Sequence, residues 1–268
     1  MLTYGVAADA TDDYVRIGES TAIESLRRFV SAVIEVFGDE YLRSPNEDDT
    51  ARLLAIGESR GFPDMLGSID YKDLWMWHAF FGMPGSHNDI NVLHRSSLFA
   101  RVAEGQAPKV NYTINNNEYT MGYYLADGIY PSWATIVKSI PDPQGNKKKY
   151  FATAQEACRK DVERAFGVLQ SRFAIVRGPA RFWDEATLRQ IMRACVIMHN
   201  MIVEDERDEE DDLNYDGVGE KVKISHDETP ELEEFIKNYK NIRDKDIHNQ
   251  LQDDLIEHLW QHHPDLYK

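Results

Sequence analysis

Apolar residues recur at helical spacing in the first part of the chain. Five of them follow one another three or four positions apart: Ile23, Leu26, Val30, Val33 and Phe37. This spacing places them on one face of a helix, with Thr21–Glu24 as a capping box at its start and Gly38 as its stop. A second helix is predicted over 48–56. The pattern therefore predicts a helical N-terminal segment over 1–60.

Short apolar runs in the middle of the chain have the length of strands. They lie at 66–70, 74–81 and 119–125, and the three asparagines at 115–117 predict a turn before the last of them. The second run is apolar throughout, which suits a sheet covered on both faces. The tryptophans of the chain are expected in the core. A capping box at 86–89 predicts a helix between the second and third runs.

The later part of the chain has helical patterns. A capping box at 153–156 opens a predicted helix with the core stripe Val162, Phe166, Leu169 and Phe173. Two further helices are predicted over 185–203 and 231–261. The last helix has apolar residues four apart: Ile247, Leu251, Leu255 and Leu259. Strands early and helices late predict an α/β fold, in which an RNase H-like mixed sheet is flanked by helices.

Charge is distributed unevenly along the chain. The net charge is −16, which argues against nucleic acid, but 138–193 carries twelve Lys/Arg against six Asp/Glu. The stretch 204–234 carries fifteen acids against three bases, which indicates a solvated acidic linker, with DNA mimicry or a basic partner as alternatives. Two cysteines, no secretory signal and no apolar run of membrane length favour a reducing intracellular compartment without membrane insertion.

Three acids stand where their side chains would converge on a metal. Asp70 and Asp127 follow predicted strands, and Glu163 lies on the predicted helix that contains 162–173. Three carboxylates in one place require a cation, and oxygen ligands suit Mg²⁺ or Mn²⁺. Arg159 and Arg164 neighbour Glu163 and are candidate phosphate contacts. A metal pair held by carboxylates is a common device for cutting phosphodiesters.

Several further residues have a candidate functional or structural role. Arg172, Arg177, Arg181 and Arg189 form a candidate DNA-facing strip, with an ordinary solvated surface as the alternative. Gly167, one turn after Glu163, would let a strand or a metal site approach closely. His199 follows an apolar stripe and is expected to be structural.

Several long motifs resemble those of the plant branch of the PIF/Harbinger transposase-derived nucleases. They are Gly67–Asp70, Asp73–Leu93, Gly122–Pro131, Arg159–Leu169 and Met192–Ile202, and the similarity extends over 12–262. The resemblance implies a DDE superfamily endonuclease with two divalent metals and a DNA substrate. Asp70, Asp127 and Glu163 match its three catalytic acids, and Asp89 matches a further acidic position. Relatives of this kind work with a Myb-like DNA-binding partner, which implies a nuclear location, with the cytoplasm left open.

One departure from the family bears on activity. Family members carry a strand–turn–strand stretch after the first acid, where this chain has only Tyr71 and Lys72 before Asp73. The sheet is therefore expected to be truncated by a missing strand pair. The alternative to a nuclease is a catalytically silent, domesticated descendant acting as a nuclear or chromatin interaction protein. The expected division is 1–60, a nuclease-like domain over 61–203, an acidic linker over 204–230 and a C-terminal helix over 231–268.

Overall fold

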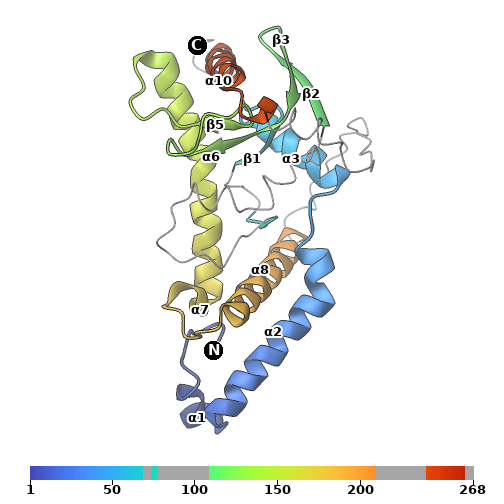
Figure 1. Cartoon of the computed structure of the whole chain (residues 1–268), viewed down its shortest axis with the longest axis vertical. Coiled ribbons are helices and arrows are strands. Elements are labelled where there is room, and N and C mark those ends of the chain that lie inside the picture. Colours follow the sequence, from blue (N-terminus) through green and yellow to red (C-terminus); the bar gives the residue numbers. More distant parts are fainter. Residues whose placement is uncertain (69–73, 78–108, 209–239, 263–268) are drawn as a thin grey trace. The chain divides into compact units, whose positions relative to one another are not determined.

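The structure, a computed structural model, describes residues 1–68, 74–77, 109–208 and 240–262 (Figure 1). The chain divides into two compact units, each assembled from separate stretches of sequence. The first holds 1–44, 72–84 and 162–217, and the second holds 45–71, 85–161 and 218–268. Helices occur in both, and the strands belong to the second. The predicted mixed α/β class is therefore confirmed.

Packed helices make up the described part of the first unit. They are α1 (Ala10–Val15), α2 (Glu19–Tyr41), α7 (Ala174–Arg177), α8 (Glu185–Asp208) and the part of α6 (Gly145–Arg172) that follows Asp161. Helices α2 and α8 pack against each other (Figure 1). Leu26, Val30 and Val33 of α2 are buried in one apolar cluster with Ile191 and Cys195 of α8. The predicted apolar face of α2 is thus confirmed.

The last turns of α6 bury a different stripe from the predicted one. Leu169 and Phe173 are buried as expected, and Ala165 is buried with them. Phe166 is 42% exposed, so its assignment to the core was wrong. Positions 165, 169 and 173 are four apart and share one face, and this face turns Phe166 outward.

The segment 74–77 was predicted as part of a strand, and this was wrong. Leu74 has a φ of +58°, in the left-handed region that interrupts extended backbone. Asn200 of α8 holds the next residues, because its Oδ1 accepts from Met76 N at 2.9 Å and its Nδ2 donates to Met76 O at 3.1 Å. The side-chain amide takes the place of a neighbouring strand. The rest of the predicted strand, 78–81, lies outside the described residues, as does the predicted helix after 86.

The described part of the second unit contains two small sheets. One is parallel, with β4 (Tyr123–Ala126) at its centre between β1 (Met65–Ser68) and β5 (Ile136–Lys138). The other is an antiparallel hairpin of β2 (Lys109–Ile114) and β3 (Asn117–Met121). Asn115 and Asn116 connect the hairpin with φ of +51° and +68°, which confirms the predicted turn. The run predicted as one strand over 119–125 is divided at Gly122 between β3 and β4.

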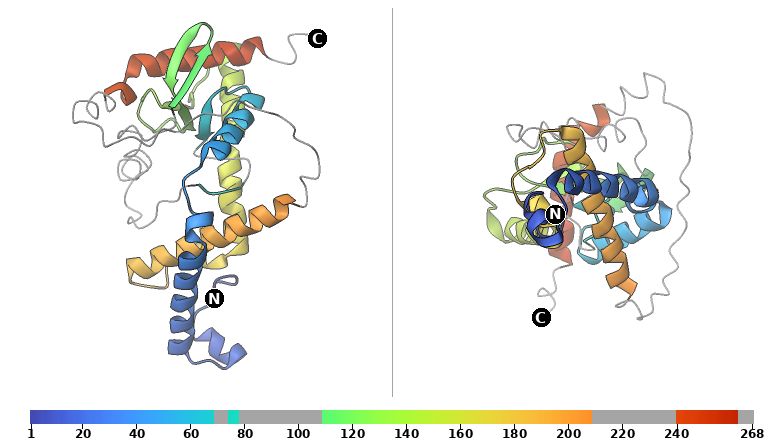
Figure 2. Two further views of the ribbon diagram at one scale, coloured as in Figure 1. Left: turned by 90° about the vertical axis from the view of Figure 1, so that its right-hand side faces the viewer. Right: turned by 90° about the horizontal axis from the view of Figure 1, so that it is seen from below.

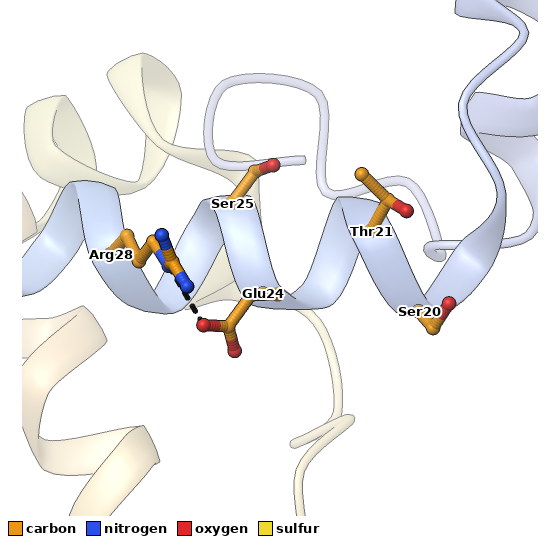
Figure 3. Close-up of a pocket in the computed structure, with 5 residues that line it drawn as sticks. All are labelled: Ser20, Thr21, Glu24, Ser25 and Arg28. Carbon is orange, nitrogen blue, oxygen red and sulfur yellow. Dashed lines mark hydrogen bonds and ion pairs between the residues drawn. The ribbon is translucent and has the colours of Figure 1, made fainter.

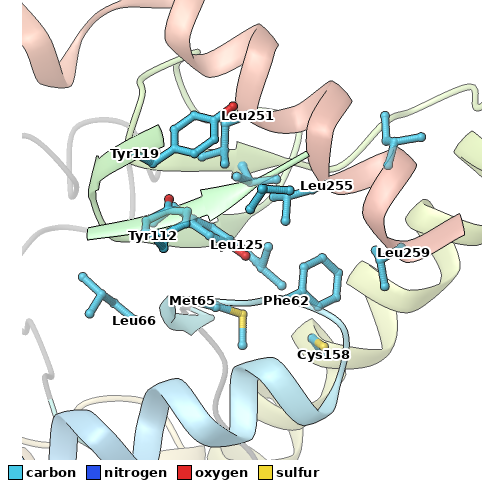
Figure 4. Close-up of a cluster of buried hydrophobic side chains, with 14 of the residues drawn as sticks. Phe62, Met65, Leu66, Tyr112, Tyr119, Leu125, Cys158, Leu251, Leu255 and Leu259 are labelled. Atoms are coloured by element: carbon cyan, nitrogen blue, oxygen red, sulfur yellow. The ribbon is translucent and has the colours of Figure 1, made fainter. Parts of the chain in front are cut away.

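Helix α10 (Lys245–Gln261) crosses the hairpin and completes the core of the second unit (Figure 2). Leu251, Leu255 and Leu259 are buried among residues of β1, the hairpin and α6 (Figure 4), which confirms the predicted stripe. Polar contacts reinforce the docking, since Asp254 Oδ2 accepts from Asn117 Nδ2 at 2.8 Å and from the Tyr119 hydroxyl at 2.5 Å. The last predicted helix is therefore an integral part of this unit.

Helix starts were predicted less well than helix faces. Helix α2 begins at Glu19, before the predicted capping box at 21–24, and Gly18 provides no side-chain cap. Helix α6 begins at Gly145, eight residues before Thr153, whose hydroxyl instead donates to the Lys149 carbonyl at 3.0 Å inside the helix. Helix α3 (Glu47–Ser59) does carry a capping box, formed by Asn46 and Asp49. Within the described ranges, no helix is long and apolar enough to cross a membrane.

Candidate active site

Asp127 lies at the carboxyl end of the central parallel strand. It follows β4 directly, as the sequence predicted, and its side chain is 49% exposed. Its Oδ1 accepts from Gly128 N at 2.5 Å and from the Ser139 hydroxyl at 3.3 Å. Ser139 follows β5, so two neighbouring strand ends contribute oxygen atoms here. This edge is where ligands commonly bind in open parallel sheets.

Gln155 of α6 forms hydrogen bonds to both of these strands, β4 and β5. Its side chain is fully buried, and its Nε2 donates to Val137 O at 2.8 Å and to Ala126 O at 3.4 Å. Ala126 is the residue before Asp127, so this amide fixes the backbone from which the carboxylate projects. The Oε1 atom of Gln155 is buried and has no hydrogen-bond partner among the described residues.

Arg159 brings a cation to the carboxylate. It lies one turn after Gln155 on the same face of α6, and its Nη2 is 3.5 Å from Asp127 Oδ2. The guanidinium group is only 25% exposed. Asp127 Oδ1 therefore faces the Gly128 N–H and the Ser139 hydroxyl, and Asp127 Oδ2 faces the positive charge of Arg159. The predicted phosphate contact thus stands beside one of the predicted acids.

The other predicted site residues have different positions. Asp70 and Asp89 lie outside the described residues. Glu163 and Arg164 are exposed on α6 and belong to the first unit, whereas Asp127 belongs to the second. The positions of the two units relative to each other are not determined, so the pairing of Asp127 with Glu163 stays a prediction. No described atom comes within 4 Å of a Cβ built on Gly167, so the predicted close approach there is not observed.

The donor set at Asp127 has the chemistry that Mg²⁺ or Mn²⁺ prefers. A half-exposed carboxylate and the Ser139 hydroxyl both offer hard oxygen atoms. Among the described residues, no group of three metal-binding side chains occurs, and Asp70 is not among those residues. The residues at this edge therefore fit one part of a divalent-metal site.

A second polar cluster lies inside the first unit, around His199. The ring Nε2 is 2.6 Å from the carbonyl of Leu74, so this nitrogen carries the proton, and Nδ1 accepts from Arg172 at 3.4 Å. Arg172 also binds both carboxylate oxygens of Glu206, at 2.5 and 2.6 Å. Burial, followed by the charge of Arg172, lowers the pKa of His199. His199 is thus a structural residue, as expected.

The predicted arginine strip is only partly available for DNA. Arg172 is 17% exposed at its side chain and is committed to Glu206, so its place in the strip was wrong. Arg189 lies 3.7 Å from Glu185 in an exposed helical pair. Arg177 and Arg181 are exposed, and no hydrogen bond or ion pair joins either of them to a described residue.

A surface depression on α2 lacks the set of carboxylates that the predicted metal chemistry requires. Its lining comes from the first turns of one helix: Ser20, Thr21, Glu24, Ser25 and Arg28 (Figure 3). The carboxylate of Glu24 already pairs with Arg28 at 2.8 Å. One paired acid does not make a divalent-metal site, so the edge at Asp127 is the better candidate.

Comparison with known proteins identifies the family. The chain matches the family described as plant transposon protein at residues 39–73 and 69–210, more than half of its length. A relative from Arabidopsis thaliana, described as Protein ALP1-like, is 24% identical over 163 residues, covering 57% of this chain and 38% of the relative. No solved structure matches significantly. The strand-end carboxylate thus belongs to a transposase-like α/β protein. The chain is a member of the plant transposon protein family, which confirms the predicted transposase ancestry.

Sequence analysis did not find Gln155 or Ser139. Neither belongs to a recognisable motif with Asp127, because the hydrogen bonds join residues that are 12, 18 and 29 positions apart along the chain. The only available signal was the position of Gln155 one turn before Arg159, on a helix already predicted to carry site residues.

Proposed function

We propose that the protein is a metal-dependent DNA endonuclease of transposase origin. Asp70, Asp127 and Glu163 together hold two Mg²⁺ or Mn²⁺ ions in this proposal. The observation that carries it is the place of Asp127 at the carboxyl end of the central parallel strand, with a hydroxyl and a guanidinium group against its two oxygens. Membership of the plant transposon protein family supports the same reading.

The order of the parallel strands supports a position for the first acid near the second. Strands β1 and β4 are parallel neighbours, and Ser68 pairs with Leu125. The chain therefore leaves β1 at the same edge of the sheet where Asp127 follows β4. Asp70 comes two residues after Ser68 and is proposed to act at this edge. The order β1-β4-β5 is also the arrangement expected for the core of an RNase H-like domain with a strand pair missing.

Each residue has a defined task in the proposed reaction. Bound Mg²⁺ or Mn²⁺ supplies water activation and stabilisation of the leaving oxygen. Asp127 provides a carboxylate ligand whose direction is set by Ser139 and Gly128. Arg159 contacts the phosphate, for which it exchanges its ion pair with Asp127, and Arg164 is a further phosphate contact. Gln155 keeps the backbone of the second acid in place.

The proposal is tested by nicking of supercoiled plasmid in the presence of Mg²⁺ or Mn²⁺. Asp127→Asn is expected to abolish nicking while the far-ultraviolet circular dichroism and melting temperature stay unchanged, because the residue is half exposed. Asp142→Asn is the matched control, since Asp142 is an exposed acid in the same unit. Equal nicking by the wild type and the Asp127→Asn protein contradicts the assignment.

Metal titration separates the nuclease from a silent descendant. The nuclease is expected to bind Mn²⁺ with a stoichiometry of two, and Asp127→Asn to lose part of that binding. A silent nuclear or chromatin interaction protein would bind none. We further propose a DNA substrate, a Myb-like partner protein that selects the site, and a nuclear location, all of which follow from the family relation.

A further inference from the structure

Trp183 is fully exposed, in contrast to the expectation that the tryptophans are core residues. Its relative exposure is 103%, whereas Trp75 in the same unit is 9% exposed. It lies in the connection between α7 and α8, and no functional role was predicted for this residue. A solvent-facing indole on a described, packed unit requires a physical reason, because its burial would stabilise the protein.

The backbone on both sides of Trp183 is anchored. Phe182 packs against the apolar cluster of the first unit. Asp184 caps α8, since its carboxylate accepts from Thr187 N at 2.9 Å, from the Thr187 hydroxyl at 2.6 Å and from Ala186 N at 3.3 Å. These hydrogen bonds lower the pKa of Asp184, so it is ionised at neutral pH. The indole is therefore held away from the core by fixed neighbours.

Two arginines lie close to Trp183 in the sequence. Arg177 and Arg181 precede it and are exposed, and neither forms an ion pair with a described residue. The two acids that follow are already engaged, Asp184 in the helix cap and Glu185 with Arg189. In a chain of net negative charge, the segment 177–183 thus holds one exposed indole and two exposed arginines that form no ion pair with a described residue.

We propose that Trp183, Arg177 and Arg181 form a binding site for single-stranded or unstacked DNA. A base stacks on the indole, and the two guanidinium groups contact adjacent phosphates. Cations that follow the backbone, together with an aromatic ring that stacks a base, are the usual elements of single-strand binding. This site rests on the proposed DNA substrate and deepens it, because it predicts that the protein engages an opened or single-stranded segment.

The test is DNA binding by the full chain in EDTA, so that catalysis plays no part. The probes are a fluorescein-labelled oligothymidylate and a duplex of the same length, measured by fluorescence anisotropy. Trp183→Ala is expected to weaken oligothymidylate binding about ten-fold, and Trp183→Phe to retain most of it, because any aromatic ring can stack. Arg181→Gln is expected to weaken both probes and to reduce the salt dependence by about 0.7 for the single strand.

Val36→Ala is the matched control, because Val36 is an apolar residue of the same unit with 67% exposure and has no arginine within four positions along α2. It should bind both probes like the wild type. Equal oligothymidylate affinity of the wild type and Trp183→Ala overturns the proposal, as does absence of binding by the wild type. A changed sedimentation coefficient of Trp183→Ala with unchanged DNA binding would assign the ring to self-association and also overturn it.

The outcome is independent of the nuclease proposal. If the wild type nicks plasmid and Trp183→Ala binds normally, the single-strand site fails and the nuclease stands. If EDTA binding depends on Trp183 but no nicking occurs with Mg²⁺ or Mn²⁺, the nuclease proposal fails and the binding site stands.

Discussion

Replacement of Gln155 tests the link between α6 and the strand ends that hold Asp127. Methionine has nearly the same shape and removes both the donor and the partnerless Oε1 atom. Loss of the hydrogen bond to Val137 costs about 1 kcal/mol, and removal of a buried orphan acceptor returns about 1–3 kcal/mol. These contributions nearly cancel. The free energy of unfolding of Gln155→Met is therefore expected to lie within about 2 kcal/mol of the wild type.

Gln155→Glu keeps the shape but turns the donor into an acceptor. At neutral pH a buried carboxylate would face the carbonyl oxygens of Ala126 and Val137 without a donor, which costs about 3–5 kcal/mol. Burial raises the pKa of the introduced glutamate above its unfolded value. The folded state then binds the proton more tightly, so stability is highest below the unfolded pKa and is lost as pH rises through the folded pKa. The defect is thus expected at neutral pH and relieved under acidic conditions.

The assay is urea unfolding, monitored by circular dichroism at about pH 7 and about pH 5, with each variant compared to the wild type at the same pH. Glu156→Gln serves as the control, because the neighbouring Glu156 is 63% exposed in a helical pair with Lys160. Its effect should stay within about 0.5 kcal/mol. A Gln155→Glu protein as stable as the wild type at neutral pH would refute the reasoning, since the side chain could not then lie against both carbonyls.

Three further changes probe the two units. Leu255→Ala should lower the free energy of unfolding by about 3 kcal/mol, because the Leu255 side chain of α10 is fully buried in the core that includes the hairpin. Urea unfolding measures this change, and an effect below about 1 kcal/mol would contradict the packing. Burial lowers the pKa of His248, so the free energy of unfolding should fall as pH drops below about 6.5. His248→Gln should reduce this dependence of the unfolding free energy on pH, and an unchanged dependence would argue against burial of the ring. Asn200→Leu should cost about 2–3 kcal/mol and speed proteolysis near Met76, whose backbone loses both partners; unchanged proteolysis would contradict the clamp.

Helix faces could be read from the sequence because they depend on local periodicity. Leu251, Leu255 and Leu259 are four apart, and a helix that buries one of them buries all three. The turn at Asn115 and Asn116 was equally local, since asparagine tolerates left-handed backbone. Such features need no knowledge of distant residues, and they were therefore predicted correctly.

Helix starts and the run at 74–81 depended on distant partners. Thr153 carries a capping pattern, yet α6 continues upstream to Gly145, where Lys147 pairs with Glu257 of α10. The apolar residues after Leu74 looked like a strand, but Asn200 occupies the backbone of Met76 instead of a neighbouring strand. Tertiary contacts overrode the local pattern in both places.

The candidate site shows the same division between local and distant information. The position of Asp127 after a strand followed from the apolar run before it, and β4 ends at Ala126 as expected. Ser139 and Gln155 could not be found, because the parallel pairing of β4 with β5 brings Ser139 to that carboxylate, and Gln155 reaches the backbone of Ala126 from α6. The exposed Trp183 was likewise missed, since an aromatic residue flanked by an anchored phenylalanine has the same local pattern as a core residue.

The departure after Asp70 has a structural consequence that the strand order defines. The family match is divided into two pieces that meet at residues 69–73, the place where the resemblance predicts a missing strand pair. Among the described strands, β4 is the neighbour of β1 in the order β1-β4-β5. Ser68 pairs with Leu125 although only Tyr71 and Lys72 stand between Asp70 and Asp73. The shortened stretch therefore leaves the pairing of β1 with the strand before Asp127 intact.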